Sequence, residues 1–376
     1  MRSLANQSSS EGSHARSATG HLEVWTGNES ARISASASDT LAASARIPMQ
    51  DPAWVQACAA TLHEHDRRRF VSWSDEGGSH AMAPLVQRMS GERGRWEIAG
   101  LHALKEPSDL MYRDAEALES LVAGLASQGY ALKLGRVPED SPTILALRRK
   151  YRGRGLVVCR PAESYPYITL DSSWREPEQR LTSRRRSDFR RSWRRAEKVG
   201  PVRSEILAPR GDEVAPWLER AIDVEARSWK GETGTALAHD PRRAAFFRHY
   251  ARRAAEGGSL RLAFLFLGDQ VAAMQMAVIQ DHRFWLLKIG FDAQFARCSP
   301  GVLLLRETIR YAAEQQLESY EMLGRTEPWL AVWTRSEKRC VEVRTYPYAL
   351  SGLLALACDL GTSVWTRLAR RFGRRP

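Results

Sequence analysis

The chain has 376 residues, of which 43% are hydrophobic and 27% are charged, and its formal net charge is +12. These values indicate a soluble globular protein of one large or two ordinary domains, and they exclude a collagen-like or disordered chain. Neither a run of 18 apolar residues nor a secretory leader is present in the sequence, so we expect no spanning helix and no export. The five cysteines are widely spaced and form no CxxC pair, which favours a reducing, cytoplasmic location.

The positive charge is concentrated in two places. Residues 180–198 carry nine Lys and Arg against two acids, and residues 361–376 carry five Arg and no acid. The rest of the chain is therefore neutral on balance. A nucleic-acid-binding protein usually has a broader basic face with interleaved aromatic side chains, so nucleic acid is not the expected partner.

The first part of the chain divides into a tail and an α/β unit. Residues 1–45 are rich in Ser, Ala, Gly and Asn, which predicts a disordered tail. Residues 46–170 alternate strand and helix patterns, and this favours an α/β half with its own sheet. The predicted strands are short ones within 82–104, then 130–134, 156–159 and 167–170, and the predicted helices are 114–128 and 144–151.

Residues 171–347 form a second predicted half. It opens with a long helical stretch that bears the first basic run and stops at Gly200-Pro201. A hairpin signal, Gly268-Asp269-Gln270, joins two clear strands. The predicted elements are helices 215–229 and 241–256, strands 260–267, 271–279 and 283–291, helix 302–316, strand 319–323, short helix 327–333 and strand 341–346.

The segment after the third of those strands has the composition of a phosphate-binding turn. Pro300 suits the first position of a helix, and Gly301 lets the backbone approach a ligand. Unpaired amides of Gly301, Val302 and Leu303, together with the helix dipole, would favour a pyrophosphate, and Arg297 would add a charge-assisted hydrogen bond. An ordinary strand-to-helix turn that starts with proline gives the same spacing.

The order of three antiparallel strands, this turn, a helix and a further strand resembles that of the GNAT acyltransferases. Residues 170–347 are similar to the acetyltransferase family that includes the CelD type of cellulose biosynthesis, which is related to the Fem-type aminoacyl transferases of peptidoglycan bridges. Residues 100–170 look like the less regular first half of that family. The matching stretches are 108–109, 134–142, 183–195, 225–230, 268–273, 291–292 and 299–304.

The resemblance implies two GNAT-like halves, each a mixed, mostly antiparallel sheet flanked by helices. It also implies acetyl-CoA or another acyl-CoA as co-substrate, with the turn from Ser299 to Val302 on the pyrophosphate. The strand end at Ile289 and Gly290 would offer amides to the thioester oxygen, where negative charge develops during acyl transfer. No metal is expected, because the His63–Asp66 run lacks a second cluster of ligands.

An amine that attacks a thioester must lose a proton, so a base is needed near the site. Glu225 is the first candidate, with a solvated or ion-paired side chain as the alternative, and Glu321 stands where the family commonly has an acid. Trp229 and Lys230 match a pair that the family places beside the substrate. Asp292 is a further candidate for substrate binding, although its position also suits a loop cap.

One part of the family pattern is missing. The family usually follows its acidic strand and glycine with a Tyr-Lys pair, and residues 323–330 contain none. Many GNAT enzymes also use a tyrosine there to protonate the leaving thiolate, yet no tyrosine lies between Tyr320 and Tyr346. Another group performs this step, or the chain has changed its substrate or lost activity.

Three functions follow from these patterns. The first is an acyl-CoA-dependent N-acyltransferase, specifically an acetyltransferase, acting on an amine such as an amino sugar in polysaccharide or cell-envelope metabolism. The second is a Fem-like aminoacyl transferase that uses charged tRNA, with residues 180–198 on the RNA phosphates. The third is a non-catalytic partner at the membrane surface. Residues 348–376 are predicted to form a basic amphipathic helix, either packed on the body or lying on an anionic membrane, peripheral at its inner face.

Overall fold

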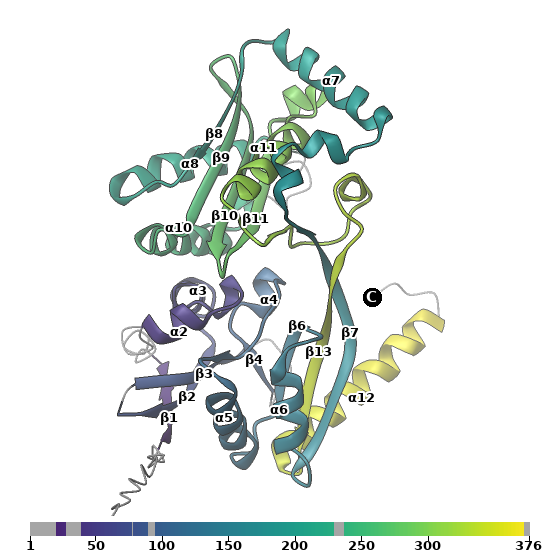
Figure 1. Cartoon of the computed structure of the whole chain (residues 1–376). Helices are drawn as coiled ribbons and strands as arrows, with labels where there is room; N and C mark the ends of the chain where they lie inside the picture. Colours follow the sequence, from purple (N-terminus) through teal and green to yellow (C-terminus); the bar gives the residue numbers. More distant parts are fainter. Residues whose placement is uncertain (1–19, 28–38, 77, 89–94, 229–236, 372–376) are drawn as a thin grey trace, which may run out of the picture.

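The computed structural model describes residues 20–27, 39–76, 78–88, 95–228 and 237–371. Its strands join in one continuous 13-stranded sheet that passes through both halves of the chain (Figure 1). The strands are β1 (His21–Thr26), β2 (Arg67–Asp75), β3 (Gly78–Gln87), β4 (Trp96–Ile98), β5 (Met111–Tyr112), β6 (Leu132–Pro138), β7 (Gly155–Thr169), β8 (Val202–Leu207), β9 (Leu260–Leu267), β10 (Gln270–Gln280), β11 (Arg283–Phe291), β12 (Ser319–Glu321) and β13 (Glu337–Pro347).

The strand order is β1-β2-β3-β4-β6-β13-β7-β12-β11-β10-β9-β8, with β5 paired to β3. Two neighbouring pairs in the described chain are parallel, β4 with β6 and β11 with β12, and the other pairs are antiparallel. The predicted fold class, a mixed and mostly antiparallel α/β architecture in two halves, is therefore confirmed.

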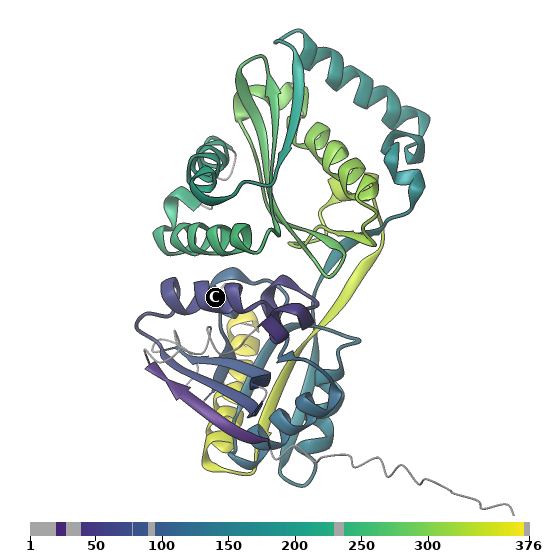
Figure 2. The ribbon, with the colours of Figure 1, turned by 60° about the vertical axis from the view of Figure 1, so that its left-hand side comes forward.

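Ten α-helices of the described chain flank this sheet. They are α2 (Asp39–Ser44), α3 (Pro52–Thr61), α4 (Leu101–Leu104), α5 (Ala115–Ser127), α6 (Pro142–Lys150), α7 (Ser183–Glu197), α8 (Val214–Ala226), α10 (Pro241–Glu256), α11 (Pro300–Glu314) and α12 (Leu350–Arg371). In the C-terminal half, α8 and α10 cover one face of the strands and α7 and α11 cover the other (Figure 2). None of the described helices combines the length and apolar character that crossing a bilayer requires.

The two halves share one apolar core. Helix α10 begins where Asp240 accepts a hydrogen bond from the Arg243 amide (3.1 Å) and Pro241 takes the first helical position. Its buried side chains recur every three to four residues and meet α3 across the boundary between the halves. Trp54 of α3 makes edge-on contacts with Phe246 and Tyr250, at centroid distances of 4.8 and 4.9 Å.

Strands β7 and β13 run side by side along the length of the molecule (Figure 1). Strand β13 also pairs with β6, so the last strand of the chain completes the sheet of the N-terminal half. Two short strands were predicted where β7 is a single one. Pro161 and Pro166 interrupt its apolar pattern, but its pairing with β13 keeps the backbone extended through both prolines.

The predicted disordered tail over residues 1–45 needs a correction. Strand β1 pairs with β2 from His21↔Ser74 to Thr26↔Arg69, and α2 follows. A polar edge strand is held by backbone hydrogen bonds, which composition does not reveal. Strand β2 was not predicted. The long helical stretch predicted from residue 172 is two 3₁₀ turns followed by α7.

Candidate active site

Strands β11 and β12 are parallel for only three residues and then separate. Their pairing runs from Arg283↔Ser319 to Trp285↔Glu321. Strand β12 ends there because Leu323 and Gly324 both take left-handed backbone conformations, with φ of 51° and 60°, which turn the chain away. In the described chain the rest of β11, as far as Phe291, has β10 as its strand partner, and the pairing with β12 does not extend to it.

A β-bulge lies on the separated part of β11. Met276 pairs with Lys288 and Ala277 pairs with Leu286, which leaves Leu287 as the extra residue. A bulge reverses the alternation of side chains beyond it. Ile289 therefore faces the core beneath α11, while the Cα of Gly290 faces α8.

Gly290 allows α8 to approach the strand closely. A Cβ atom at this position would lie 2.9 Å from the Cα of Glu225 and 3.1 Å from its Cβ. Glu225, the first candidate base, is 1% exposed, and its Oε2 accepts a hydrogen bond from the Leu237 amide (3.1 Å). The carboxylate thus lies beside the predicted acyl-CoA strand and holds the backbone that follows α8. Trp229 and Lys230, its predicted companions, lie outside the described residues.

The predicted phosphate turn is a sharp one. Ser299 has a left-handed backbone (φ 51°, ψ 50°) and Pro300 begins α11 directly after it. The prediction of three unpaired amides is wrong in two cases, because the amides of Val302 and Leu303 donate to the Ser299 carbonyl at 3.0 and 3.2 Å. Within the described chain no group accepts from the Gly301 amide. A Cβ at Gly301 would meet only an edge atom of Phe291, at 3.6 Å, so this side of the turn is open.

Asp292 and Arg297 hold the segment between β11 and α11. Asp292 is 4% exposed, caps the turn by accepting from the Gln294 amide (3.1 Å) and forms an ion pair with Arg227 Nε (2.7 Å). It therefore serves as a cap and links α8 to the turn. The Arg297 side chain is exposed, and its carbonyl accepts from Arg195 Nη1 at 3.2 Å.

That contact brings the basic helix α7 to the turn. Only Phe189 and Ala196 of α7 are buried, and Arg306 of α11 lies over the rings of Phe189 and Trp193. The outward side of α7 is a row of arginines next to the predicted phosphate site. The exposed ones are Arg184, Arg185, Arg190, Arg191, Arg194 and Arg195.

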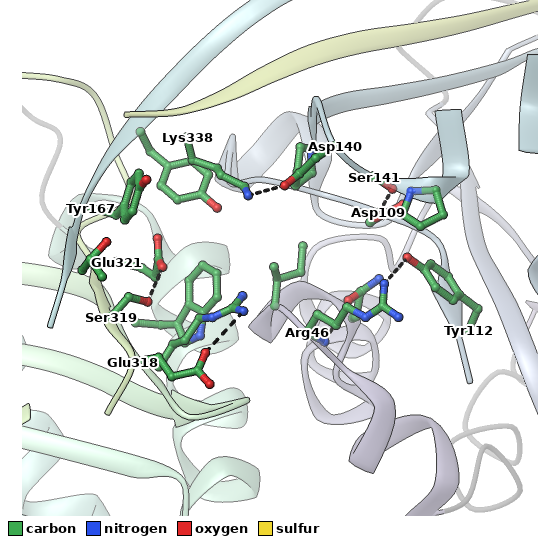
Figure 3. A pocket seen from close by; sticks show the side chains of 18 residues that line it. Arg46, Asp109, Tyr112, Asp140, Ser141, Tyr167, Glu318, Ser319, Glu321 and Lys338 are labelled. Carbon is green, nitrogen blue, oxygen red and sulfur yellow. Dashed lines mark hydrogen bonds and ion pairs between the residues drawn. The ribbon is translucent and has the colours of Figure 1, made fainter. Parts of the chain in front are cut away.

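A cavity of about 420 Å³ opens between the two halves (Figure 3). Its C-terminal wall comes from the paired part of β11 and β12, and its N-terminal wall comes from the segments before α3 and around β5 and α6. The lining carries both charges. The charged members are Arg46, Asp109, Asp140, Arg283, Glu318, Glu321 and Lys338.

Glu321, the second candidate base, lines this cavity. Its side chain is 6% exposed, and its Oε1 accepts a hydrogen bond from the Ser319 hydroxyl (2.5 Å). Burial raises the pKa of Glu321, while the Ser319 hydrogen bond and the charges of Arg283 and Lys338 oppose that rise. A carboxylate with a raised pKa in a cavity is a stronger proton acceptor than a solvated one.

The opposite wall holds a carboxyl group that the sequence analysis did not select. Asp109 accepts from the Ser141 hydroxyl (2.6 Å) and from the Leu110 amide (2.8 Å). Burial raises its pKa to about 6. Beside it, Lys338 Nζ lies 2.5 Å from Asp140 Oδ2 (Figure 3). The available signal was the family resemblance, whose matching stretches include residues 108–109.

Arg136 ties the loop after β12 to the N-terminal half. Its guanidinium donates to the carbonyls of Lys105 (2.7 Å), Glu163 (3.1 Å) and Gly324 (2.8 Å). Glu106 lies 4.0 Å from the same guanidinium. Burial raises the pKa of Glu106, and Arg136 and further cations offset part of the rise. A second group of charged side chains thus adjoins the point where β11 and β12 separate.

Tyr320 does not replace the missing family tyrosine. Its ring is completely buried, and its hydroxyl lies 3.0 Å from the Thr308 hydroxyl and donates to Gln275 (3.3 Å). This tyrosine fastens β12 to α11. Across the described parts of the chain, no three His, Cys, Asp or Glu side chains come together as a metal site would require.

Comparisons with known proteins agree with this architecture. Residues 183–329 match the profile of a family described as the acetyltransferase (GNAT) domain, so this segment is similar to that family. No curated protein matches the chain.

Two solved structures share the fold over most of the chain. One is the C-terminal DUF2156 domain of a protein assigned as a lysylphosphatidylglycerol synthetase of Agrobacterium fabrum, with 13% identity, a TM-score of 0.54, and 89% of this chain and 96% of that chain covered. The other is FemX, also with 13% identity and a TM-score of 0.54, covering 86% of this chain and 97% of that chain. At this identity the likeness is one of fold.

Proposed function

We propose that the protein, whose residues 183–329 match the acetyltransferase (GNAT) domain family, is an acyl-CoA-dependent N-acyltransferase and specifically an acetyltransferase. The observation that carries the proposal is the position of the β11–β12 separation, which leads straight to the open turn at Ser299–Gly301 within the matched segment. A thioester between these strands would supply the activated acyl group.

The chain's own groups suit that co-substrate. The open side of Gly301 and its amide, at the N-terminus of a helix, suit a phosphate group. The exposed arginines of α7 lie on the same side and attract an anion. The part of β11 beyond its pairing with β12, at Ile289 and Gly290, would lie along the pantetheine arm and the thioester oxygen.

The cavity between the halves is the proposed acceptor site. It lies on the paired part of β11, and the bulge at Leu287 follows Trp285 of its wall by two residues, which is about 7 Å along a strand. Glu321 would accept the proton that the attacking amine gives up. The acids of the lining suit an ammonium group and its cations suit hydroxyl or acidic groups, as on an amino sugar of polysaccharide or cell-envelope metabolism. Membership of the CelD type is part of this proposal.

Calorimetric titration with acetyl-CoA, CoA and dephospho-CoA tests the proposal. The wild type should bind acetyl-CoA in the micromolar range, and Gly301→Asp should abolish binding because its carboxylate would face the phosphates. An acid in the first turn of a helix favours the helix, so thermal unfolding should show an intact fold. Gly361→Asp is the matched control, since Gly361 has no positive φ and lies in open space on α12, away from the turn. A wild type that binds none of the three compounds would refute the proposal.

The exposed arginine row of α7 supports a second candidate, aminoacyl transfer from charged tRNA. An RNA held by several arginines loses affinity steeply as salt rises. Filter binding of aminoacyl-tRNA between 50 and 200 mM salt, with wild type and Arg190→Gln/Arg194→Gln, separates the two functions. Tight, salt-dependent RNA binding without acyl-CoA binding would favour tRNA.

A further inference from the structure

A buried ion-pair network determines which side of the C-terminal helix α12 faces the protein body. Asp359 of α12 is 4% exposed and accepts two hydrogen bonds from Arg95, at 2.8 and 2.7 Å. Arg344 Nη1 also donates to it (2.5 Å), as does the Tyr346 hydroxyl. Arg95 is itself 1% exposed. The acidic side of this helix therefore faces the body, and its opposite side faces outward.

That outward side is apolar. Six of the ten exposed large hydrophobic side chains in the described chain gather here, although single exposed ones are normal anywhere on a surface. On α12 the leucines stand at position 350 and then three, four and ten residues later, which places all four on one side of the helix. They are Leu350 (73% exposed), Leu353 (61%), Leu354 (49%) and Leu360 (59%), joined by Tyr348 (65%) just before the helix and Leu156 (48%) of β7, which sits opposite Tyr346 in the sheet.

The charge around this stripe is positive. From residue 348 to the C-terminus Asp359 is the only acid, and its charge is matched by Arg95 and Arg344. The same segment carries five arginines, all beyond residue 366. In the described chain the exposed residues Arg152 and Arg154 lie next to the start of the stripe, where the Arg154 carbonyl accepts from the Tyr348 amide (2.7 Å).

We propose that this surface, the outward stripe of α12 with Tyr348 and Leu156, binds the face of an anionic phospholipid bilayer. Leucines along one side of a helix enter the boundary between headgroups and acyl chains, and adjacent arginines bind the phosphates. A second copy of the chain would bring an identical positive surface against this one, which charge repulsion disfavours. Figure 1 shows α12 along the outer side of β7 and β13, clear of the C-terminal half.

Flotation of the full-length protein with vesicles tests the proposal. The wild type should float with phosphatidylglycerol–phosphatidylcholine vesicles and should stay behind with phosphatidylcholine alone. Leu353→Glu/Leu354→Glu should abolish flotation. Leu145→Glu is the matched control, because Leu145 of α6 is 51% exposed away from this surface. Arg152→Gln/Arg154→Gln should lower the partition coefficient about 25-fold, since each arginine near an anionic surface contributes roughly fivefold.

Two results would overturn the proposal. One is equal flotation of wild type and Leu353→Glu/Leu354→Glu. The other is no flotation together with a wild-type dimer, seen by sedimentation, that the same substitutions dissociate. Acetyl-CoA titration of the variants keeps this test separate from the proposed enzymatic function, because α12 lies outside that site and co-substrate affinity should not change.

Discussion

The two halves of the molecule share one strand–helix–strand arrangement, but the surroundings of that arrangement differ between them. Each contains one parallel strand pair joined through a helix, β4–α5–β6 in the first and β11–α11–β12 in the second. Strand β11 is long, bulged and followed almost at once by α11. Strand β4 has three residues, and residues 99–114 intervene before α5.

The intervening segment changes what the first half can do. It holds Ser108 and Asp109, both buried, and Ser108 donates to the Gly135 carbonyl (2.6 Å), which fills the region where the parallel strands end. The corresponding region of the C-terminal half is open at Gly301. Under the proposed function, the first half is a scaffold that supplies one wall of the cavity, and the second half would hold the reacting groups. Substitutions should affect stability in the first half and turnover in the second.

The largest expected effect is on stability, for Arg95→Met in the scaffold half. It leaves Asp359 buried without its main partner, and breaking a buried ion pair costs about 3–5 kcal/mol. Urea unfolding at pH 7 measures the loss. Arg339→Met is the control, because its ion pair with Glu139 is solvent-exposed and worth at most about 1 kcal/mol. A loss below 1 kcal/mol for Arg95→Met would contradict the scaffold role.

This network also has a defined pH dependence. Burial alone would raise the pKa of Asp359, but hydrogen bonds from Arg95, Tyr346 and Arg344 outweigh it and hold the pKa below its usual range. Its contribution is therefore present above the unfolded pKa of about 4 and is lost as the pH falls below that value. Unfolding curves of wild type and Arg95→Met should converge in acid.

The next prediction compares the two carboxyl groups that face each other across the cavity. Glu321→Gln should lower kcat by about 100-fold or more, because it removes the proposed base, whereas Asp109→Asn, at a lining acid of the proposed acceptor site, should raise KM and change kcat by less than about threefold. Since the pKa of Glu321 is raised, the wild-type rate should climb with pH through that raised value, and the glutamine variant should lose this limb. Equal losses of kcat in both variants would contradict the placement of the reacting group in the second half.

Asp109 should instead appear in the pH dependence of stability. Its pKa of about 6 in the folded protein exceeds the ordinary value near 3.8. Such a group contributes stability that is complete below the unfolded pKa and is lost as the pH rises through 6. Between pH 4 and pH 7 the wild type should therefore lose about 2 kcal/mol relative to Asp109→Asn, measured by urea unfolding at each pH.

The smallest effect compares one glycine from each half. A Cβ at Gly290 would meet the backbone Cα of Glu225 at 2.9 Å, whereas a Cβ at Gly135 would meet the movable Cδ1 of Leu101. Gly290→Ala should cost about 1–3 kcal/mol, and Gly135→Ala should cost less than about 1 kcal/mol because Leu101 can rotate. Only Gly290→Ala should also weaken acetyl-CoA binding. Urea unfolding measures the two losses of stability, and calorimetry measures acetyl-CoA binding by each variant.

Helices with strong local signals were predictable from the sequence. Helix α10 was predicted with its observed bounds because Asp240, Pro241 and a regular apolar repeat all indicate the same start and face. Strands β9 to β11 were predicted nearly to the residue from their hairpin signals. Strand β2 was not predicted, because three arginines at its start obscure the alternation of apolar and polar residues. The joining of β13 to β6 is a long-range pairing that local patterns do not contain.

The candidate site likewise has features that the sequence predicted and features that it did not. The turn at Ser299 has a local signature in its proline and glycine, and Glu321 was selected because the family that the chain resembles commonly has an acid there. The cavity wall formed by Arg46, Asp109 and Lys338 did not emerge, because these residues are distant in sequence and meet only when the sheet closes. The occupation of the Val302 and Leu303 amides depends on the conformation of Ser299, which composition does not specify.

The position of β13 sets an order for folding on the ribosome. Strand β6 and the first part of β7 are made early, but their shared neighbour β13 follows after residue 336. At about 5–20 residues per second, the nascent first half waits roughly 10–35 s with two open strand edges. Strands β8 to β12 of the second half are therefore synthesised before β13, which completes the first half. Translation that stalls between residues 170 and 337 would release chains whose first half cannot close, so rapid synthesis of the final strand guards this protein against aggregation.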